Sequence, residues 1–131
     1  MSKNIRVSGR AAGRYAKKTK HNGRTYDSKA EAAHAADLDN LVKANRVRFW
    51  IPQPLIELGH PGMRYRPDFM VAAPYWANSQ LVFLECHEVK GVDTAEFRRI
   101  VELWRRAGPC DLVIYRKGKE PERIVPNGQA V

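Results

Sequence analysis

The stretch from Leu81 to Gly91, LVFLECHEVKG, constrains the fold more than any other part of the chain. It opens with a run of apolar residues, which predicts a buried β-strand. Its last third carries the titratable side chains Glu85, His87, Glu88 and Lys90. Burying a polar or ionised group without compensation costs several kcal/mol. A strand of this composition is therefore expected to end at a functional site.

Alternation of side chains divides this strand into two faces. One face carries Val82, Leu84, Cys86, Glu88 and Lys90, and the other carries Leu81, Phe83, Glu85, His87 and Val89. In the preceding segment, 63–72, Asp68 shares a face with Met70. If the two segments pair as a hairpin, Asp68 lies beside Glu88. Glu85 and His87, on the opposite face, are interpreted as partners for a helix residue or as solvent-facing groups.

The rest of the pattern predicts two helices and two further extended segments. A helix is expected within 26–47, with Ser28 as N-cap and Glu31 at the capping-box position. Segment 48–58 is expected to be extended, and its two prolines confine it to a sheet edge or a bulge. A second helix is expected over 94–107, capped by Asp93 and Glu96, and a short strand over 111–117. This order predicts an α/β fold with a mixed β-sheet flanked by helices.

The net charge of +9 is concentrated at the N-terminus, where residues 1–26 contain eight basic residues and no acidic one. Residues 1–25, called the arm below, are predicted to be a flexible segment that binds DNA or another polyanion. A solvated tail that only maintains solubility is the alternative. The candidate DNA-binding residues of the arm are Arg10, Arg14, Lys17, Lys18, Lys20 and Arg24. The expected core covers residues 26–117, and residues 118–131 are expected to be a loosely attached tail.

Asp68, Glu88 and Lys90 together predict a metal site. Hard divalent cations such as Mg²⁺ take oxygen ligands and often use one or two carboxylates together with a substrate phosphate. Glu31 falls on the apolar face of the first helix and could join them. Simpler interpretations exist: Glu31 as a capping-box residue, Asp68 as a turn residue paired with Arg66, and an exposed ion pair at the end of the strand.

The two cysteines, Cys86 and Cys110, lack a CxxC spacing and are expected to be reduced and mostly buried. No apolar run approaches the length of a membrane span, and the N-terminus lacks the apolar stretch of a secretory signal. These features predict an intracellular, cytoplasmic protein with no membrane partner.

The string RPDF, followed some twenty residues later by ECHEVKG, resembles the PD-(D/E)xK nuclease superfamily, in particular small phage-type endonucleases similar to Holliday junction resolvases. The resemblance covers about residues 26–117. It implies a restriction-endonuclease-like core in which Asp68, Glu88 and the Val89 carbonyl bind Mg²⁺ or Mn²⁺ and Glu31 completes the site. Lys90 would position the attacking water. It also implies a homodimer acting in the cytoplasm of the phage's host, for which Trp50, Tyr75 and Trp76 are candidate interface residues.

The function predicted in this way is a metal-dependent endonuclease that hydrolyses phosphodiester bonds in branched DNA such as four-way junctions. A less selective DNA-nicking endonuclease with the same site is one alternative. A non-catalytic nucleic-acid-binding module, in which the carboxylates are structural, is the other.

Overall fold

A mixed five-stranded sheet forms the centre of the computed structural model, which describes residues 19–21, 24–26, 28–59 and 62–127. The strands lie in the order β3 (Phe49–Pro52), β6 (Phe69–Pro74), β7 (Val82–Val89), β8 (Asp111–Tyr115) and β9 (Glu122–Ile124). Strands β7 and β8 are parallel, and the other neighbours are antiparallel. The predicted α/β class with a mixed sheet is confirmed.

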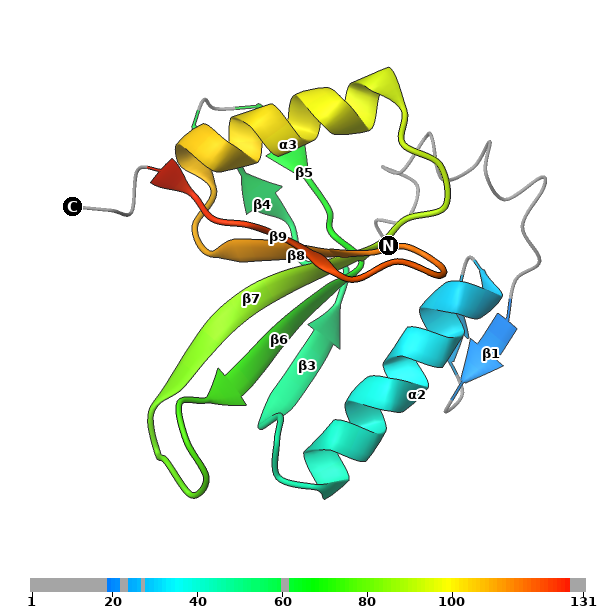
Figure 1. The fold of residues 1–131 in the computed structure, drawn as a ribbon, viewed down its shortest axis with the longest axis vertical. Helices are drawn as coiled ribbons and strands as arrows, with labels where there is room; N and C mark the ends of the chain where they lie inside the picture. The colour runs from blue at the N-terminus through cyan, green and yellow to red at the C-terminus, as the bar shows by residue number, and fades with distance from the viewer. Residues whose placement is uncertain (1–18, 22–23, 27, 60–61, 128–131) are drawn as a thin grey trace.

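The two helices cover opposite faces of this sheet (Figure 1). Helix α2 (Lys29–Lys43) covers one face, forming the α2-side core. Helix α3 (Ala95–Ala107) connects β7 to β8 and lies on the other face, forming the α3-side core. The α2-side core comprises Ala32, Ala35, Leu38, Val47, Phe69 and Val71. The α3-side core comprises Ile56, Leu58, Cys86, Phe97, Trp104, Leu112, Ile114 and Ile124.

The helix caps agree with the prediction for α2 and differ for α3. The Ser28 side chain accepts a hydrogen bond from the Glu31 N–H (3.1 Å), as the capping pattern indicates. At α3 the N-cap is Thr94, whose hydroxyl accepts from the Phe97 N–H (3.0 Å), so the prediction that Asp93 caps this helix is wrong. The carboxylate of Asp93 instead binds the Arg116 guanidinium in a two-bond contact (2.8 and 3.1 Å).

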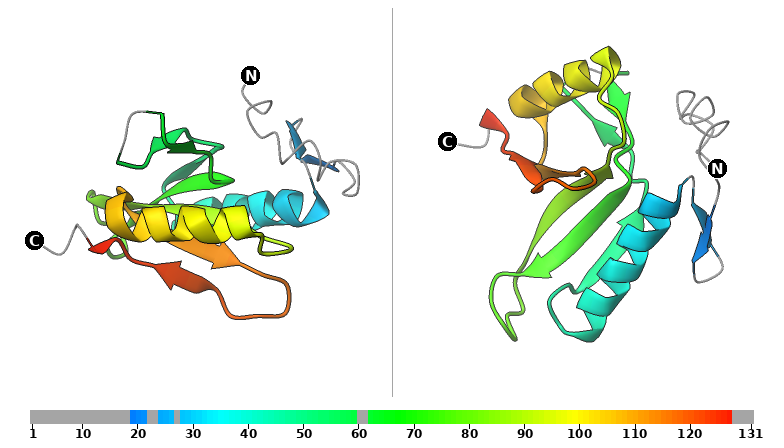
Figure 2. Two further views of the ribbon diagram at one scale, coloured as in Figure 1. Left: turned by 90° about the horizontal axis from the view of Figure 1, so that it is seen from above. Right: turned by 45° about the vertical axis from the view of Figure 1, so that its right-hand side comes forward.

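Both extended segments before β7 are broken into two strands. Segment 48–58 divides into the edge strand β3 and β4 (Ile56–Glu57), because Gln53, between two prolines, adopts a positive φ of 49°. Segment 63–72 divides into β5 (Arg64–Tyr65) and β6. Strands β4 and β5 form a separate two-stranded sheet, which Figure 2 shows standing off the main sheet. The break leaves Asp68 immediately before β6.

Three further strands lie wholly or mostly outside the predicted core. Within the arm, β1 (Thr19–His21) pairs with β2 (Arg24–Tyr26) as a hairpin beside α2 (Figure 1). Within the predicted tail, β9 pairs with β8 and places Ile124 in the α3-side core, so residues 122–124 are not loosely attached. In the described part of the chain, no helix combines the length and the apolar character needed to cross a membrane.

Candidate metal centre at one end of the sheet

The β6–β7 hairpin brings Asp68 and Glu88 to neighbouring positions. The two strands pair antiparallel with Phe69 opposite His87 and Met70 opposite Cys86. Continuing this register by one residue places Asp68 opposite Glu88, and the Val89 N–H next to Glu88 donates a hydrogen bond to Asp68 Oδ2 (2.7 Å). The predicted pairing of these segments is therefore confirmed.

Both carboxylates are buried, which disfavours the simpler interpretations of them. Asp68 is 2% exposed and Glu88 is 5% exposed, so neither lies on an exposed strand end or turn. The segment containing Asp68 leads into β6, which is an inner strand of the sheet. A guanidinium N–H of Arg66 donates to the Gln53 carbonyl (2.8 Å), anchoring the chain just before Asp68.

Tyr65 is a residue of the site that the sequence pattern did not indicate. Its hydroxyl donates a hydrogen bond to Glu88 Oε1 (2.5 Å). Its ring lies near those of Phe97 and Trp104 in the α3-side core, at centroid distances of 6.5 and 6.2 Å. A continuous strand would place Tyr65 on the face opposite Asp68, but the break between β5 and β6 removes that constraint. Hydrogen bonds of this kind orient a carboxylate ligand.

Lys90 lies just beyond β7, on the same side as Glu88. Its N–H donates to the Tyr115 carbonyl (2.9 Å), which continues the pairing of β7 with β8. Its ammonium nitrogen lies 4.4 Å from the centroid of the Phe97 ring, a cation–π contact. The contact keeps the ammonium at the start of α3, close to the end of β7.

Helix α2 carries Glu31 to the same end of the sheet. Asp39 of α2 accepts a hydrogen bond from the Trp50 indole (2.9 Å), and Trp50 lies opposite Val71. One turn or more earlier, His34 contacts the Phe69 ring (5.3 Å between centroids). Moving toward the N-terminus of α2 thus corresponds to moving along β6 toward Asp68. Glu31 precedes His34 by nearly one turn, and Glu31 is only 8% exposed.

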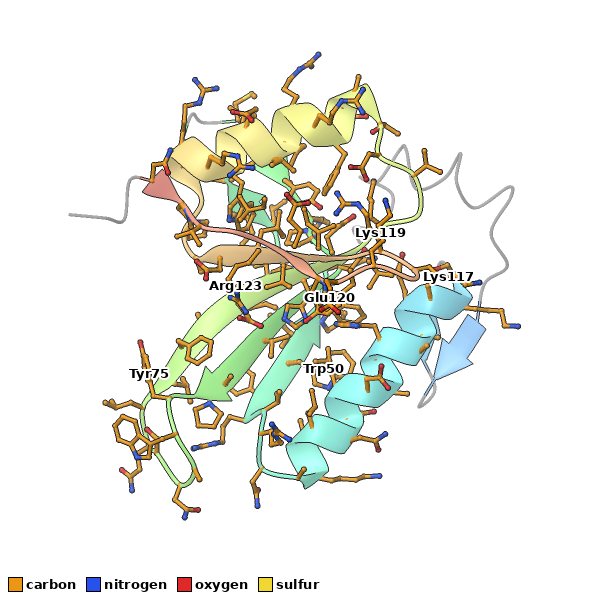
Figure 3. All side chains as sticks on the ribbon, in the orientation of Figure 1. Trp50, Tyr75, Lys117, Lys119, Glu120 and Arg123 are labelled. Atoms are coloured by element: carbon orange, nitrogen blue, oxygen red, sulfur yellow. The ribbon has the colours of Figure 1, made fainter. Side chains whose placement is uncertain are left out.

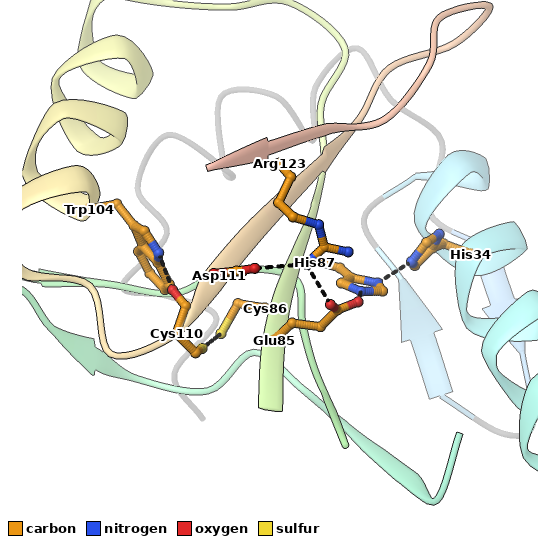
Figure 4. Close-up of polar contacts among 8 residues, drawn as sticks. All are labelled: His34, Glu85, Cys86, His87, Trp104, Cys110, Asp111 and Arg123. Carbon is orange, nitrogen blue, oxygen red and sulfur yellow. Dashed lines mark hydrogen bonds and ion pairs between the residues drawn. The ribbon is translucent and has the colours of Figure 1, made fainter. Parts of the chain in front are cut away.

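A second polar cluster lies on the α2 side of the sheet and has a structural explanation (Figure 4). His34 Nε2 and His87 Nδ1 are 2.9 Å apart, and His87 Nε2 lies 2.6 Å from Glu85 Oε2. Arg123 of β9 binds both Glu85 and Asp111 at 2.9 Å. The expectation of a helix partner is confirmed for His87, because His34 belongs to α2. The partners of Glu85 are instead His87 and Arg123 of β9, and both Glu85 and His87 are buried rather than solvent-facing.

The pKa values of Glu85 and His34 are both lowered in this cluster, for different reasons. Burial alone would raise the pKa of Glu85, but hydrogen bonds and charges from His87 and Arg123 outweigh it and lower that pKa. Burial, reinforced by repulsion from His87, lowers the pKa of His34 to about 4. His34 is thus neutral at pH 7, and its uncharged ring packs against Phe69, His87 and Tyr115.

The two cysteines are free thiols, as predicted. Their sulfur atoms lie 3.9 Å apart in the α3-side core, and the Trp104 indole N–H donates to the Cys110 carbonyl (2.6 Å; Figure 4). The hydrogen bond with Cys110, followed by burial, raises the pKa of the Cys86 thiol. Cys86 is therefore a packing residue rather than a metal-binding thiolate.

The candidate DNA-binding and interface residues fall in several places. Arg10, Arg14, Lys17 and Lys18 lie outside the described residues, while Lys20 belongs to β1 and Arg24 to β2. Figure 3 shows Trp50 among the side chains between α2 and the sheet, where its ring contacts Phe69 edge-on, so it is a half-buried residue that packs against the α2-side core. Tyr75 and Trp76 are exposed at the β6–β7 turn.

The chemistry of the donors fits a hard divalent cation. Asp68, Glu88 and Glu31 supply carboxylate oxygens, which Mg²⁺ and Mn²⁺ prefer. Among the described residues, no group of three or more His, Cys, Asp or Glu side chains is arranged as a complete metal site. Mg²⁺ does not require one, because it keeps several water molecules and commonly uses only one or two protein carboxylates.

In comparisons with protein-family models, curated proteins and solved structures, nothing matched this chain.

Proposed function

We propose that the protein is a metal-dependent endonuclease with a restriction-endonuclease-like core that hydrolyses phosphodiester bonds in branched DNA. One observation carries the proposal: Asp68 and Glu88, both buried, occupy neighbouring positions of the β6–β7 hairpin, at the end of the sheet toward which Glu31 and Lys90 also lie. Two ionised carboxylates at neighbouring positions of paired strands repel each other, and a cation bound between them would remove the repulsion.

Each residue of the site would have a distinct role. Asp68, Glu88 and the Val89 carbonyl would hold Mg²⁺ or Mn²⁺, with Glu31 completing the set. When bound, such an ion supplies Lewis-acid activation of the attacking water and neutralises phosphate charge. The Lys90 ammonium, held at the Phe97 ring, would orient the water and stabilise negative charge developing on the phosphate. The Tyr65 hydroxyl would fix one oxygen of Glu88.

The arm supports a DNA substrate. Its excess of Lys and Arg suits phosphate contacts, which provide affinity and salt dependence without sequence specificity. Branched DNA presents phosphates from several duplex arms close together, so such contacts would favour a four-way junction over linear duplex. Symmetric cutting of a junction requires two sites related by a two-fold axis, and we therefore propose a homodimer.

The deciding experiment is incubation of a labelled four-way junction with the protein, with and without Mg²⁺, analysed on a denaturing gel. The wild-type protein should cut only with the metal, while Asp68→Asn and Glu88→Gln should cut at least 100-fold more slowly and still bind the junction. Glu57→Gln, which neutralises an exposed carboxylate on β4, is the matched control and should cut normally. Cleavage that survives both site substitutions would refute the proposal.

Two further comparisons separate the alternatives. Equal cutting of linear duplex and junction would support the less selective nicking endonuclease. Metal-independent binding without any cutting would support the non-catalytic module. For the arm, a deletion of residues 1–18 keeps the β1–β2 hairpin and should weaken binding and reduce its salt dependence; unchanged binding would exclude residues 1–18 as a DNA contact.

A further inference from the structure

Helix α3 carries a row of arginines on the side that faces away from the sheet. Its inner side buries Phe97 and Trp104 in the α3-side core. At about 100° per residue, the four arginines fall within an arc of about 120° on the outer side. They are Arg98, Arg99, Arg105 and Arg106, called the arginine row below. Figure 1 shows α3 on the outside of the molecule, and in Figure 3 side chains project from it away from the sheet.

The positive charge of this row is poorly neutralised. Glu102 lies among the four arginines and contacts only Arg105, at 3.7 Å. Its spacing would also permit pairs with Arg98, Arg99 or Arg106, yet within the described residues none of these three makes an ion pair. Arg105 and Arg106 lie in the last turn of α3, where the helix dipole favours cations. Arg98 and Arg99 lie near the N-terminal end of the helix, where the dipole disfavours cations. Helix stability therefore does not explain these two members of the row, whereas a polyanionic partner would.

The row starts beside the candidate metal centre and leads away from it. Phe97, whose ring holds the Lys90 ammonium, directly precedes Arg98. Asp93, in the loop between β7 and α3, has a lowered pKa chiefly because of its hydrogen bond with Arg116, and the charges of Lys90 and Arg98 lower it further. Arg105 follows Arg98 by seven positions along the helix, a rise of about 10.5 Å, which corresponds to about three base-pair steps of duplex DNA.

We propose that the arginine row binds backbone phosphates of a duplex DNA arm and aligns that arm with the candidate metal centre. The inference rests on the proposed function and adds a second DNA contact, on a rigid helix, to the arm. Arginine suits this role because its planar guanidinium binds phosphate oxygens through two hydrogen bonds. The contact would be independent of base sequence.

The test compares two double variants of the full chain that remove the same charge. Arg99→Gln/Arg106→Gln removes two exposed members of the row, and Lys43→Gln/Arg46→Gln removes two exposed cations at the end of α2 that is farthest from Asp68. Binding to a labelled four-way junction is measured in EDTA by fluorescence anisotropy at 50–200 mM salt. Cleavage by each protein is measured separately with Mg²⁺. Circular dichroism melting confirms that both variants fold.

We expect the row variant to lose about 1.8 from the magnitude of the salt slope, since each duplex phosphate contact contributes about 0.9. Raising the salt from 50 to 200 mM weakens binding of both proteins, and the factor by which it does so should be about 12-fold smaller for the row variant than for the wild type. At 50 mM salt the row variant should bind the junction more weakly than the wild type. The control should keep the wild-type slope. Arg99→Lys/Arg106→Lys, which keeps the charge, should restore most of it.

The failures of the two proposals are distinguishable. If the wild type cuts junctions and the row variant binds with the wild-type slope and affinity, the arginine row is overturned and the proposed function stands. If the salt slope of junction binding decreases by the same amount in both double variants, a specific role of the row is also overturned. If the slope difference is present but the wild type never cuts with Mg²⁺, the proposed function is overturned and the row remains a DNA-binding surface.

Discussion

Replacing Tyr65 with Phe removes one hydroxyl group and leaves the ring in its place between Phe97 and Trp104. The hydroxyl donates to Glu88 Oε1, and Glu88 is buried. A hydrogen bond to a charged group is worth about 1.5–3 kcal/mol, which corresponds to about 10–150-fold in an equilibrium constant. Loss of a group that orients a metal ligand typically costs about 10–100-fold in metal affinity or activity. The two estimates agree.

We therefore expect Tyr65→Phe to weaken Mn²⁺ binding by about 10–100-fold, measured by isothermal titration calorimetry on the full chain. Cleavage of a labelled junction should need a correspondingly higher Mg²⁺ concentration and recover much of its rate when the metal is raised. This recovery distinguishes an effect on metal binding from a general loss of structure.

Tyr75→Phe is the matched control, because it removes the same hydroxyl from a tyrosine that is 59% exposed and remote from Glu88 along β7. It should bind Mn²⁺ and cut DNA like the wild type. Identical metal affinity and metal dependence in Tyr65→Phe and Tyr75→Phe would refute the argument that Tyr65 orients Glu88 as a metal ligand.

Three other predictions concern stability, each measured by urea unfolding. Burial and a neighbouring histidine lower the pKa of His34 to about 4, so the unfolded chain takes up a proton that the folded protein excludes. The free energy of unfolding should fall by up to about 3 kcal/mol between pH 6.5 and 4, and His34→Gln should remove most of this dependence. The hydrogen bond from Arg116 lowers the pKa of Asp93, so Arg116→Gln should cost less than about 1 kcal/mol at pH 7. The difference should shrink as acid protonates Asp93, which leaves only the pair of Arg116 with Glu122; a difference that does not change with pH would contradict this. Trp104→Phe removes a buried hydrogen bond and leaves a cavity, so it should lower the free energy of unfolding by about 2 kcal/mol or more. A decrease below about 0.5 kcal/mol would contradict this and show that the core repacks around the smaller ring.

Local patterns predicted the parts of the site that depend on neighbouring residues. The Ser28 cap follows from its spacing to Glu31, and the inward direction of Glu88 follows from alternation along β7. The approach of Asp68 to Glu88 follows from the short connection between two extended segments, because such segments usually pair as antiparallel neighbours.

Contacts between distant segments were not predictable in the same way. Tyr65 reaches Glu88 only because the chain breaks between β5 and β6, and no single residue in that stretch indicates where the side chain then points. Strand β9 has little apolar content, and Ile124 becomes a core residue only through its pairing with β8. The partnership of His34 with His87 depends on how α2 crosses the sheet.

The position of β9 has a consequence for the chain during its synthesis. Strand β8 emerges before β9 and, once paired with β7, presents an open row of backbone donors and acceptors along its other side. Such a row readily recruits strands from other nascent chains. Pairing with β9 covers this side of β8, and the new edge is a three-residue strand that carries Glu122 and Arg123. Short, charged edge strands resist pairing with other chains, so this segment protects the finished sheet from aggregation.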